Sequence, residues 1–228
     1  MRIGILGAGM VGQTLGAALA ARGHAVTIGV RAPGPAALSQ DRGPAGTLGE
    51  WAARTGGRTG SFADAAAHGE IVFNATRGEG SLAALSAAGR DNLAGKVLVD
   101  AANPLDFSQG MPPFLIREFS GPTSLGEQIQ AAFPATRVVK AFNTVTAAVM
   151  VNPALIPGPH DLFIAGNDGE AKAAVADLAR GFGWREIVDL GDIVGARGME
   201  AILPVWVRIW AVTGGSTHNF HLARGVPA

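Results

Sequence analysis

The N-terminal segment places a glycine-rich motif between a short strand and a helix. Residues 3–6 predict a buried strand, and residues 7–12 read Gly-Ala-Gly-Met-Val-Gly. Apolar residues then recur at helical spacing from Val11 to Leu19, and a second strand is predicted over residues 25–30. A Gly-x-Gly-x-x-Gly motif in such a strand–helix–strand unit is typical of dinucleotide-binding proteins.

Each glycine of the motif has a separate purpose. Gly7 permits the tight turn, Gly9 lets a diphosphate approach the backbone, and Gly12 allows the helix to pack closely on the strand. The helix N-terminus also offers free N–H groups and a partial positive charge to an anion. The residues predicted to hold the diphosphate are Gly7, Ala8, Gly9, Met10, Val11 and Gly12.

The end of the second strand indicates which dinucleotide binds. NAD-specific proteins usually carry Asp or Glu roughly 20 residues after the motif, where the carboxylate bonds the ribose 2′-hydroxyl. Here the strand ends at Val30 and Arg31, and the first carboxylate is Asp41. The forked guanidinium of Arg31 suits a 2′-phosphate. We therefore predict NADP(H) as the cofactor, bound in part by Val30 and Arg31.

Composition excludes several classes of function. The 228 residues are 48% hydrophobic and 16% charged, with a formal net charge of zero, which gives no basis for binding nucleic acid. There is no Cys, so thiolate catalysis and cysteine-ligated metals are excluded. No stretch resembles a signal peptide or a membrane span, and we predict a soluble, cytoplasmic protein without a bound metal.

The chain offers no evident proton relay. Tyr is absent, which excludes a Tyr-x-x-x-Lys mechanism, and the five His residues show no metal-ligand spacing. Lys140 is the one candidate acid near the predicted rim of the sheet, although its place within a strand favours a structural role. We therefore predict no catalytic side chain and a hydride transfer that depends on the positioning of two rings.

Strands alternating with helices predict an α/β fold with an N-terminal doubly wound Rossmann domain, residues 1–150. Further buried strands are expected over residues 71–76, 96–100 and 137–143. In such a sheet the ligand lies beyond the carboxyl ends of the strands. The residues at those ends, predicted to contact the cofactor, are Asn74, Ala75, Thr76, Ala101, Asn103 and Asn143.

Residues 151–228 predict a smaller C-terminal α/β domain. Its strands are expected over residues 161–166 and 185–190, with a helix capped by Asn167 between them. Residues 192–212 predict a long helix, apolar on nearly every side and kinked at Pro204, which would wall the cleft and form a homodimer interface. Arg197 and Glu200 are expected to pair along it.

The segment between the two last Rossmann strands carries no periodic pattern. Residues 105–122 contain three prolines and predict an irregular loop. Loops of this length are often lids or binding loops. A disordered insert is the alternative.

In these motifs the chain resembles the NADP-dependent coenzyme F420 reductase family. The resemblance covers most of the chain and rests on the glycine motif and Arg31 together with five further segments: Asn103–Asp106, Ser124–Gln128, Val138–Thr144, Ala196–Glu200 and Asn219–His221. It implies that coenzyme F420, a deazaflavin, lies face to face with the nicotinamide between the two domains. The residues implied on the deazaflavin side are Asn143, Val145, Ala147, Gly191, Ile193 and Gly195.

Two positions depart from the family pattern. Asn143 stands where His is frequent, and the tail reads Asn-Phe-His in place of Asn-Phe-Lys. Other readings therefore remain beside F420: an NADPH-dependent reductase of a flavin, an imine, a quinone or ferric ion, or a regulatory protein that binds NADP(H) without turnover.

Overall fold

A computed structural model, which describes residues 1–225, shows eight strands in one sheet. The strand order is β10-β9-β8-β5-β4-β1-β2-β3. The strands are β1 (Arg2–Leu6), β2 (Ala25–Val30), β3 (Arg58–Ser61), β4 (Ile71–Asn74), β5 (Val97–Asp100), β8 (Arg137–Ala141), β9 (Asp161–Gly166) and β10 (Glu186–Asp189). The predicted α/β fold with a parallel N-terminal sheet is confirmed.

Alternate residues of the strands feed two separate cores. In β1, Ile3 and Ile5 belong to one core and Leu6 to the other, as the period of two in a strand requires. The first core is covered by α1 (Met10–Ala21), α3 (Leu48–Thr55), α8 (Ala147–Val151) and α9 (Gly169–Phe182). The second is covered by α4 (Phe62–His68), α5 (Ser81–Ala88), α6 (Arg90–Leu93), α7 (Leu125–Ala132) and α10 (Ala196–Ala201).

The sheet continues across the predicted domain boundary at residue 150. β9 pairs antiparallel with β8, with Val139 opposite Gly166, and β10 pairs parallel with β9. The strands of the predicted C-terminal domain therefore extend the sheet of the N-terminal domain. The last three residues of that predicted domain, 226–228, lie outside the described part of the chain.

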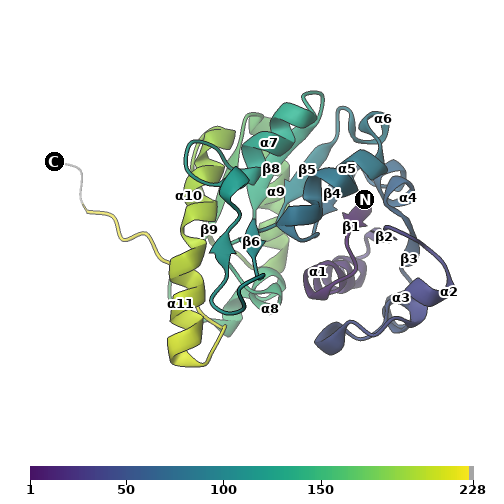
Figure 1. The fold of residues 1–228 in the computed structure, drawn as a ribbon, viewed down its shortest axis with the longest axis horizontal. Helices are drawn as coiled ribbons and strands as arrows, with labels where there is room; N and C mark the ends of the chain where they lie inside the picture. The colour runs from purple at the N-terminus through teal and green to yellow at the C-terminus, as the bar shows by residue number, and fades with distance from the viewer. Residues whose placement is uncertain (226–228) are drawn as a thin grey trace.

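The predicted loop over residues 105–122 contains a small hairpin. β6 (Leu105–Asp106) and β7 (Phe114–Leu115) pair antiparallel in a separate two-stranded sheet. Figure 1 shows this hairpin beside α11 (Leu203–Thr213), although nearly ninety residues separate the two in the sequence. The remaining short elements are α2 (Pro35–Ser39) and the 3₁₀ turns Gly43–Ala45, Gly78–Gly80, Arg117–Phe119, Pro153–Leu155 and Ile193–Gly195.

Two details of the C-terminal predictions were wrong. Helix α9 is capped by Asp168, whose carboxylate accepts from the Ala171 N–H at 2.7 Å, while the amide oxygen of Asn167 accepts from the Ile193 N–H instead. The long helix expected over residues 192–212 is divided, because α10 ends at Ala201 and α11 begins at Leu203. Pro204 lies in the first turn of α11, where its missing N–H costs nothing.

The segment that follows α11 is hydrogen-bonded to the sheet at Asn219 and Phe220. The Asp161 N–H at the start of β9 donates to the Phe220 carbonyl at 2.9 Å, and Asn219 Nδ2 donates to the Asp161 carbonyl at 2.8 Å. Helix α11 nevertheless leaves apolar side chains exposed, among them Val205 and Val212. Within residues 1–225, no helix combines the length and apolar character that crossing a bilayer requires.

Candidate functional site

The N-terminus of α1 is shaped to receive an anion. Gly9 precedes the helix without a side-chain cap, and the first turn holds no acidic residue. A Cβ on Gly9 would meet no atom within 4 Å, whereas one on Gly12 would lie 2.0 Å from the Gly7 carbonyl oxygen. The backbone is thus open at the position predicted to face the diphosphate and closed at the position predicted to pack.

Two arginines meet in a cavity beside this turn. The cavity has a volume of about 330 Å³ and is lined by Gly7, Ala8, Val30, Arg31, Ala32, Ala37, Gln40, Arg42 and Phe62. Among residues 1–225, neither Arg31 nor Arg42 forms an ion pair with a carboxylate. Two unpaired guanidinium groups on one cavity suit a phosphate.

Arg42 was missed by the sequence analysis. It lies after α2, far from the glycine motif, and its Nη1 donates to the Gln40 carbonyl at 2.8 Å. The available signal was that Arg42 is the one Lys or Arg between Arg31 and Arg54. Pattern alone could not show that the Pro- and Gly-rich segment returns this side chain to the end of β2.

Two asparagines clasp each other at the carboxyl ends of β5 and β8. Asn103 Nδ2 donates to the Asn143 carbonyl at 2.8 Å, and Asn143 Nδ2 donates to Asn103 Oδ1 at 3.2 Å and to the Met199 carbonyl at 2.8 Å. Phe142, fully buried, has a φ of 65°, a left-handed conformation that costs a bulky residue about 1–3 kcal/mol. This backbone turn places Asn143 against α10 and joins the two halves of the chain at the rim.

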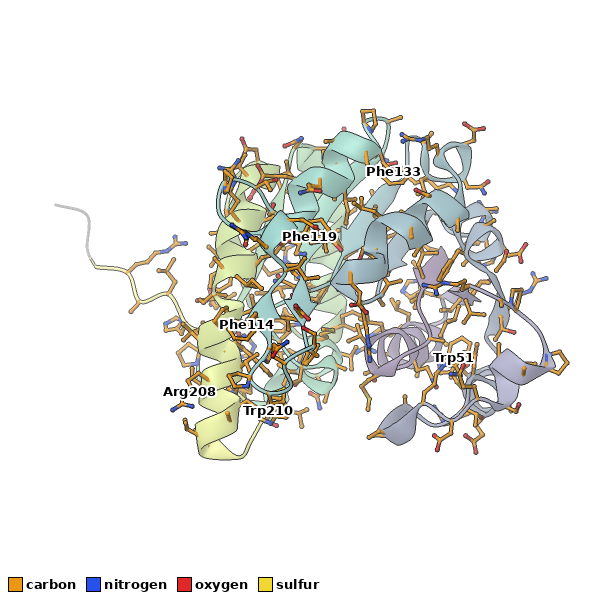
Figure 2. All side chains as sticks on the ribbon, viewed as in Figure 1. Trp51, Phe114, Phe119, Phe133, Arg208 and Trp210 are labelled. Carbon is orange, nitrogen blue, oxygen red and sulfur yellow. The ribbon has the colours of Figure 1, made fainter. Side chains whose placement is uncertain are left out.

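A larger and mainly apolar cleft, of about 520 Å³, extends from α1 past the asparagine clasp to α11. Cavities of this size commonly hold cofactors or small substrates. Leu203, Trp206, Val207 and Trp210 of α11 line its far wall, and Phe107 and Met111 of the hairpin segment line its edge. In Figure 2, Trp210 and Arg208 lie on opposite sides of α11. Part of the predicted C-terminal segment, α11, thus lines this cleft.

The structure distributes the predicted residues unevenly. Lining the large cleft are Met10, Val11, Ala101, Asn103, Asn143, Val145 and Ala147, and lining the arginine cavity are Gly7, Ala8, Val30 and Arg31. Within residues 1–225, the walls of the large cleft do not include Gly191, Ile193 or Gly195. Ile193 packs instead in the core beneath α7, so the structure does not bring this segment to the other predicted residues.

The polar side chains at the carboxyl end of β4 hydrogen-bond to one another and to the interior. Asn74 is fully buried, and its Nδ2 donates to Asp100 Oδ1 at 2.8 Å and to Ser81 Oγ at 3.0 Å. Thr76 Oγ1 donates to Asn74 Oδ1 at 2.6 Å. These side chains support the rim, and any contact of residues 74–76 with a cofactor stays a prediction.

The predicted Arg197–Glu200 pair does not form. Arg197 pairs with Glu127 of α7 at 2.6 Å, and Glu200 turns inward to Lys140 at 2.8 Å. Hydrogen bonds from Arg197, together with those from Ser124, lower the pKa of Glu127. Lys140 is fully buried and also pairs with Asp100, so it cannot reach a substrate as an acid.

Known proteins and a family model resemble this chain. Residues 2–104 match the family model for "NADP oxidoreductase coenzyme F420-dependent". The crystal structure of a candidate F420-dependent NADP reductase from Arthrobacter sp. FB24 is 50% identical, with a TM-score of 0.92 over 98% of this chain and 100% of that one. The chain belongs to the F420-dependent NADP oxidoreductase family. The predicted family and the predicted class of enzyme, an NADP-dependent oxidoreductase, are thereby confirmed.

The chain aligns with less than two thirds of the length of each of two curated relatives. The F420-dependent NADP reductase of Methanocaldococcus jannaschii is 31% identical over 144 residues, which are 63% of each chain. Metalloreductase STEAP3 of Rattus norvegicus is 32% identical over 221 residues, covering 90% of this chain and 38% of the rat protein. The family model is named for NADP and coenzyme F420, the two redox molecules predicted here.

Proposed function

We propose that this protein transfers a hydride between NADP(H) and coenzyme F420. The observation that carries the proposal is the cleft that begins at the N-terminus of α1, passes Asn103 and Asn143, and ends at the tryptophans of α11. When bound, NADPH supplies a hydride and the deazaflavin ring of F420 takes it up. The chain's own contribution is to bind both molecules and fix their relative position.

The residues present fit NADP(H). The open backbone at Gly9 and the uncapped helix suit the diphosphate, and the cavity of Arg31 and Arg42 suits the 2′-phosphate. The nicotinamide would then lie against Ala101, Asn103 and Asn143, where the cleft widens toward α11.

The remaining walls suit a second planar ring. Trp206, Val207 and Trp210 offer apolar contact on one side, with Val145 and Ala147 on the other. Such walls exclude water from the space between two rings, and transfer of a hydride between rings held at contact distance needs no acid at the reacting carbon. This agrees with the enclosure of Lys140, the one candidate acid, in the interior.

A turnover assay with alternative acceptors tests the proposal. Purified protein is mixed with NADPH and, separately, with F420, FMN or a ferric chelate, and both NADPH loss and acceptor reduction are followed by absorbance. We expect F420 to be reduced fastest, with NADPH preferred to NADH. Faster reduction of FMN than of F420 would indicate that the second substrate is a flavin.

A ferric acceptor is the second candidate. It is supported by the 32% identity to Metalloreductase STEAP3 over 90% of this chain. Faster reduction of the ferric chelate than of F420 would favour it. Binding of NADPH without oxidation by any of the three acceptors would favour a regulatory protein.

We also propose that residues 151–228 form the lobe that walls the cleft and that the protein is a cytoplasmic homodimer. Val205 and Val212 are 52% and 63% exposed on the outward side of α11, and a second copy of the chain would cover them. Light scattering on the purified protein gives its mass in solution. A mass equal to one chain would contradict the homodimer.

A further inference from the structure

Three charged side chains lie buried directly behind the asparagine clasp. Lys140 Nζ is 2.9 Å from Asp100 Oδ2 and 2.8 Å from Glu200 Oε1, and it donates to the Ala102 carbonyl at 2.6 Å. The side chains of Asp100 and Lys140 are 0% exposed and that of Glu200 is 2% exposed. The three residues come from β5, β8 and α10, and thus join both predicted lobes.

Both carboxylates of this cluster are ionised, because N–H groups alone surround their oxygens. Asp100 Oδ1 accepts from Asn74 Nδ2 and from the Ala102 N–H, and Glu200 accepts from the Leu125 and Gly126 N–H groups at the start of α7. None of these donors can accept a carboxyl proton in return.

The lysine is ionised as well. Burial alone lowers the pKa of Lys140, but the charges of Asp100 and Glu200 outweigh burial and raise the pKa above its ordinary value. Two carboxylates and one ammonium leave one negative charge in excess. The two N–H groups of α7 offset part of it with their partial positive charge.

The excess charge lies one layer behind the wall of the cleft. Ala102, whose carbonyl binds the Lys140 ammonium, stands between Ala101 and Asn103, and both of these line the cleft. On the other side, Met199 precedes Glu200, and its carbonyl binds the Asn143 amide. The neighbouring Arg197–Glu127 pair is neutral as a whole and leaves the excess in place.

We propose that the Asp100–Lys140–Glu200 cluster biases the bound cofactor toward NADP⁺ and so favours hydride donation from NADPH to the second substrate. The inference rests on the proposed binding of NADP(H) at this cleft, whichever second substrate is reduced. The nicotinamide ring is cationic in NADP⁺ and neutral in NADPH, while the phosphates are the same in both. A fixed negative charge near the ring therefore attracts the oxidised form alone.

The size of the bias follows from Coulomb's law. One unit charge at about 10 Å in an effective dielectric of about 20 changes a binding constant by roughly tenfold. The partial charge of α7 reduces the effect, and we expect about a three- to tenfold preference from the cluster. Asp100 and Glu200 do not touch the ring and are positioning residues that act through the field.

Calorimetric titration of the full chain with NADP⁺ and with NADPH tests the inference in the variant Glu200→Gln. The ratio Kd(NADP⁺)/Kd(NADPH) should rise about three- to tenfold over the wild-type ratio, because the cluster becomes neutral. A general loss of stability would weaken the binding of NADP⁺ and of NADPH alike and would leave the ratio of their Kd values unchanged. The matched control is Glu127→Gln, which removes a carboxylate that is 15% exposed and whose partner on the same helix, Arg197, is 42% exposed, and it should leave the ratio within about twofold.

An unchanged ratio in Glu200→Gln would overturn the inference. If circular dichroism shows that this variant is unfolded, Asp100→Asn removes the same charge from the β5 side and must give the same rise. If both variants are unfolded, the wild-type protein must bind NADP⁺ at least as tightly as NADPH, and tighter binding of NADPH overturns the inference. A protein that binds neither form refutes the proposed cofactor, whereas failure to reduce F420 leaves the ratio test intact.

Discussion

The proposed phosphate end of the site and its proposed ring end are built from different parts of the chain. Around α1 the site is formed by backbone: a turn at Gly7, an open approach at Gly9 and the free N-terminus of a helix. Where β5, β8 and α10 meet, the site is lined by Asn103 and Asn143 and supported from behind by buried side chains, with Lys140 between two carboxylates. The first arrangement needs one short segment, and the second needs three segments far apart in sequence.

This difference predicts how a substitution at each end affects ligand binding and stability. A side chain added at the phosphate end blocks the ligand without disturbing a core, because the space there is open. A side chain lost at the ring end leaves buried charges without partners, which lowers the stability of the fold in addition to any effect on the ligand. Substitutions at the phosphate end should therefore lower ligand affinity more than stability, and substitutions at the ring end should lower stability more than ligand affinity.

The largest effect is expected from Lys140→Met. The change leaves Asp100 and Glu200 together in the interior without their cation, and breaking a buried pair in this way costs about 3–5 kcal/mol. Urea unfolding followed by circular dichroism measures the loss. The control Lys172→Met breaks a partly exposed pair with Asp189 and should cost about 1 kcal/mol or less. Equal losses in the two variants would contradict the role given to the cluster.

The same lysine predicts a pH dependence at the alkaline end. The pKa of Lys140 is raised in the folded state above its ordinary value of 10.5, so its contribution to stability is complete below pH 10.5 and is lost as the pH rises through the folded pKa. The difference in unfolding free energy between wild type and Lys140→Met should be constant from pH 7 to 10 and shrink beyond 10.5. A difference that grows with pH would contradict the raised pKa of Lys140 in the folded state.

Gly9→Val tests the phosphate end. The backbone of Gly9, with φ −76° and ψ −168°, is accessible to any residue, and a new side chain meets open space. We expect NADPH affinity to fall at least about 100-fold, or about 2.7 kcal/mol, while the unfolding free energy changes by about 1 kcal/mol or less. Gly169→Val, at the open start of α9, is the control and should leave NADPH affinity unchanged.

The proposed contact with the 2′-phosphate is divided between two arginines. Arg31→Ala should weaken NADPH about tenfold or more and leave NADH within about twofold, because a charge-assisted contact is lost that NADH never makes. Arg42→Ala should weaken NADPH about three- to fivefold, since its Nη1 is already bonded to Gln40. Arg54→Ala, outside the cavity, is the control. Equal losses for NADPH and NADH in Arg31→Ala would refute the assignment.

The smallest effect is expected from Ser124→Ala. Ser124 caps α7 by accepting from the Glu127 N–H at 3.2 Å, and loss of such a cap costs about 1 kcal/mol. The two preceding N–H groups of that turn are bonded to Glu200 and should keep the helix start in place. The unfolding free energy should fall while the ratio Kd(NADP⁺)/Kd(NADPH) stays unchanged. A change in that ratio would show that the cap, and not the charge cluster, controls the cofactor.

The contrast between the two ends also explains what could be predicted from sequence. Strands β2 and β9 and the helix after the glycine motif follow from local patterns of apolar residues and were predicted nearly to the residue. The role of Arg31 in binding the 2′-phosphate was predicted from its position directly after a strand. Each of these features depends on one continuous segment and on elementary periodicity.

The partners of side chains from distant segments could not be predicted in the same way. The helical spacing of Arg197 and Glu200 predicts a pair, but Arg197 pairs with α7 and Glu200 with β8, because the fold brings other charges closer. Arg42 returns to the end of β2 through a segment with no periodic pattern. Residues 191–195 were placed at the cleft by family resemblance, and the structure packs Ile193 elsewhere.

The antiparallel pairing of β9 with β8 has a consequence for how molecules enter and leave. The eight strands form one continuous sheet, because the pairing of β8 with β9 carries its hydrogen bonds across residue 150. Swinging the two halves apart about a hinge would break the hydrogen bonds between β8 and β9, so we expect no such motion. Exchange must occur by local displacement of the Phe107–Met111 tip or of α11, so the rate of product release should respond to changes in those two segments and not to changes at the β8–β9 junction.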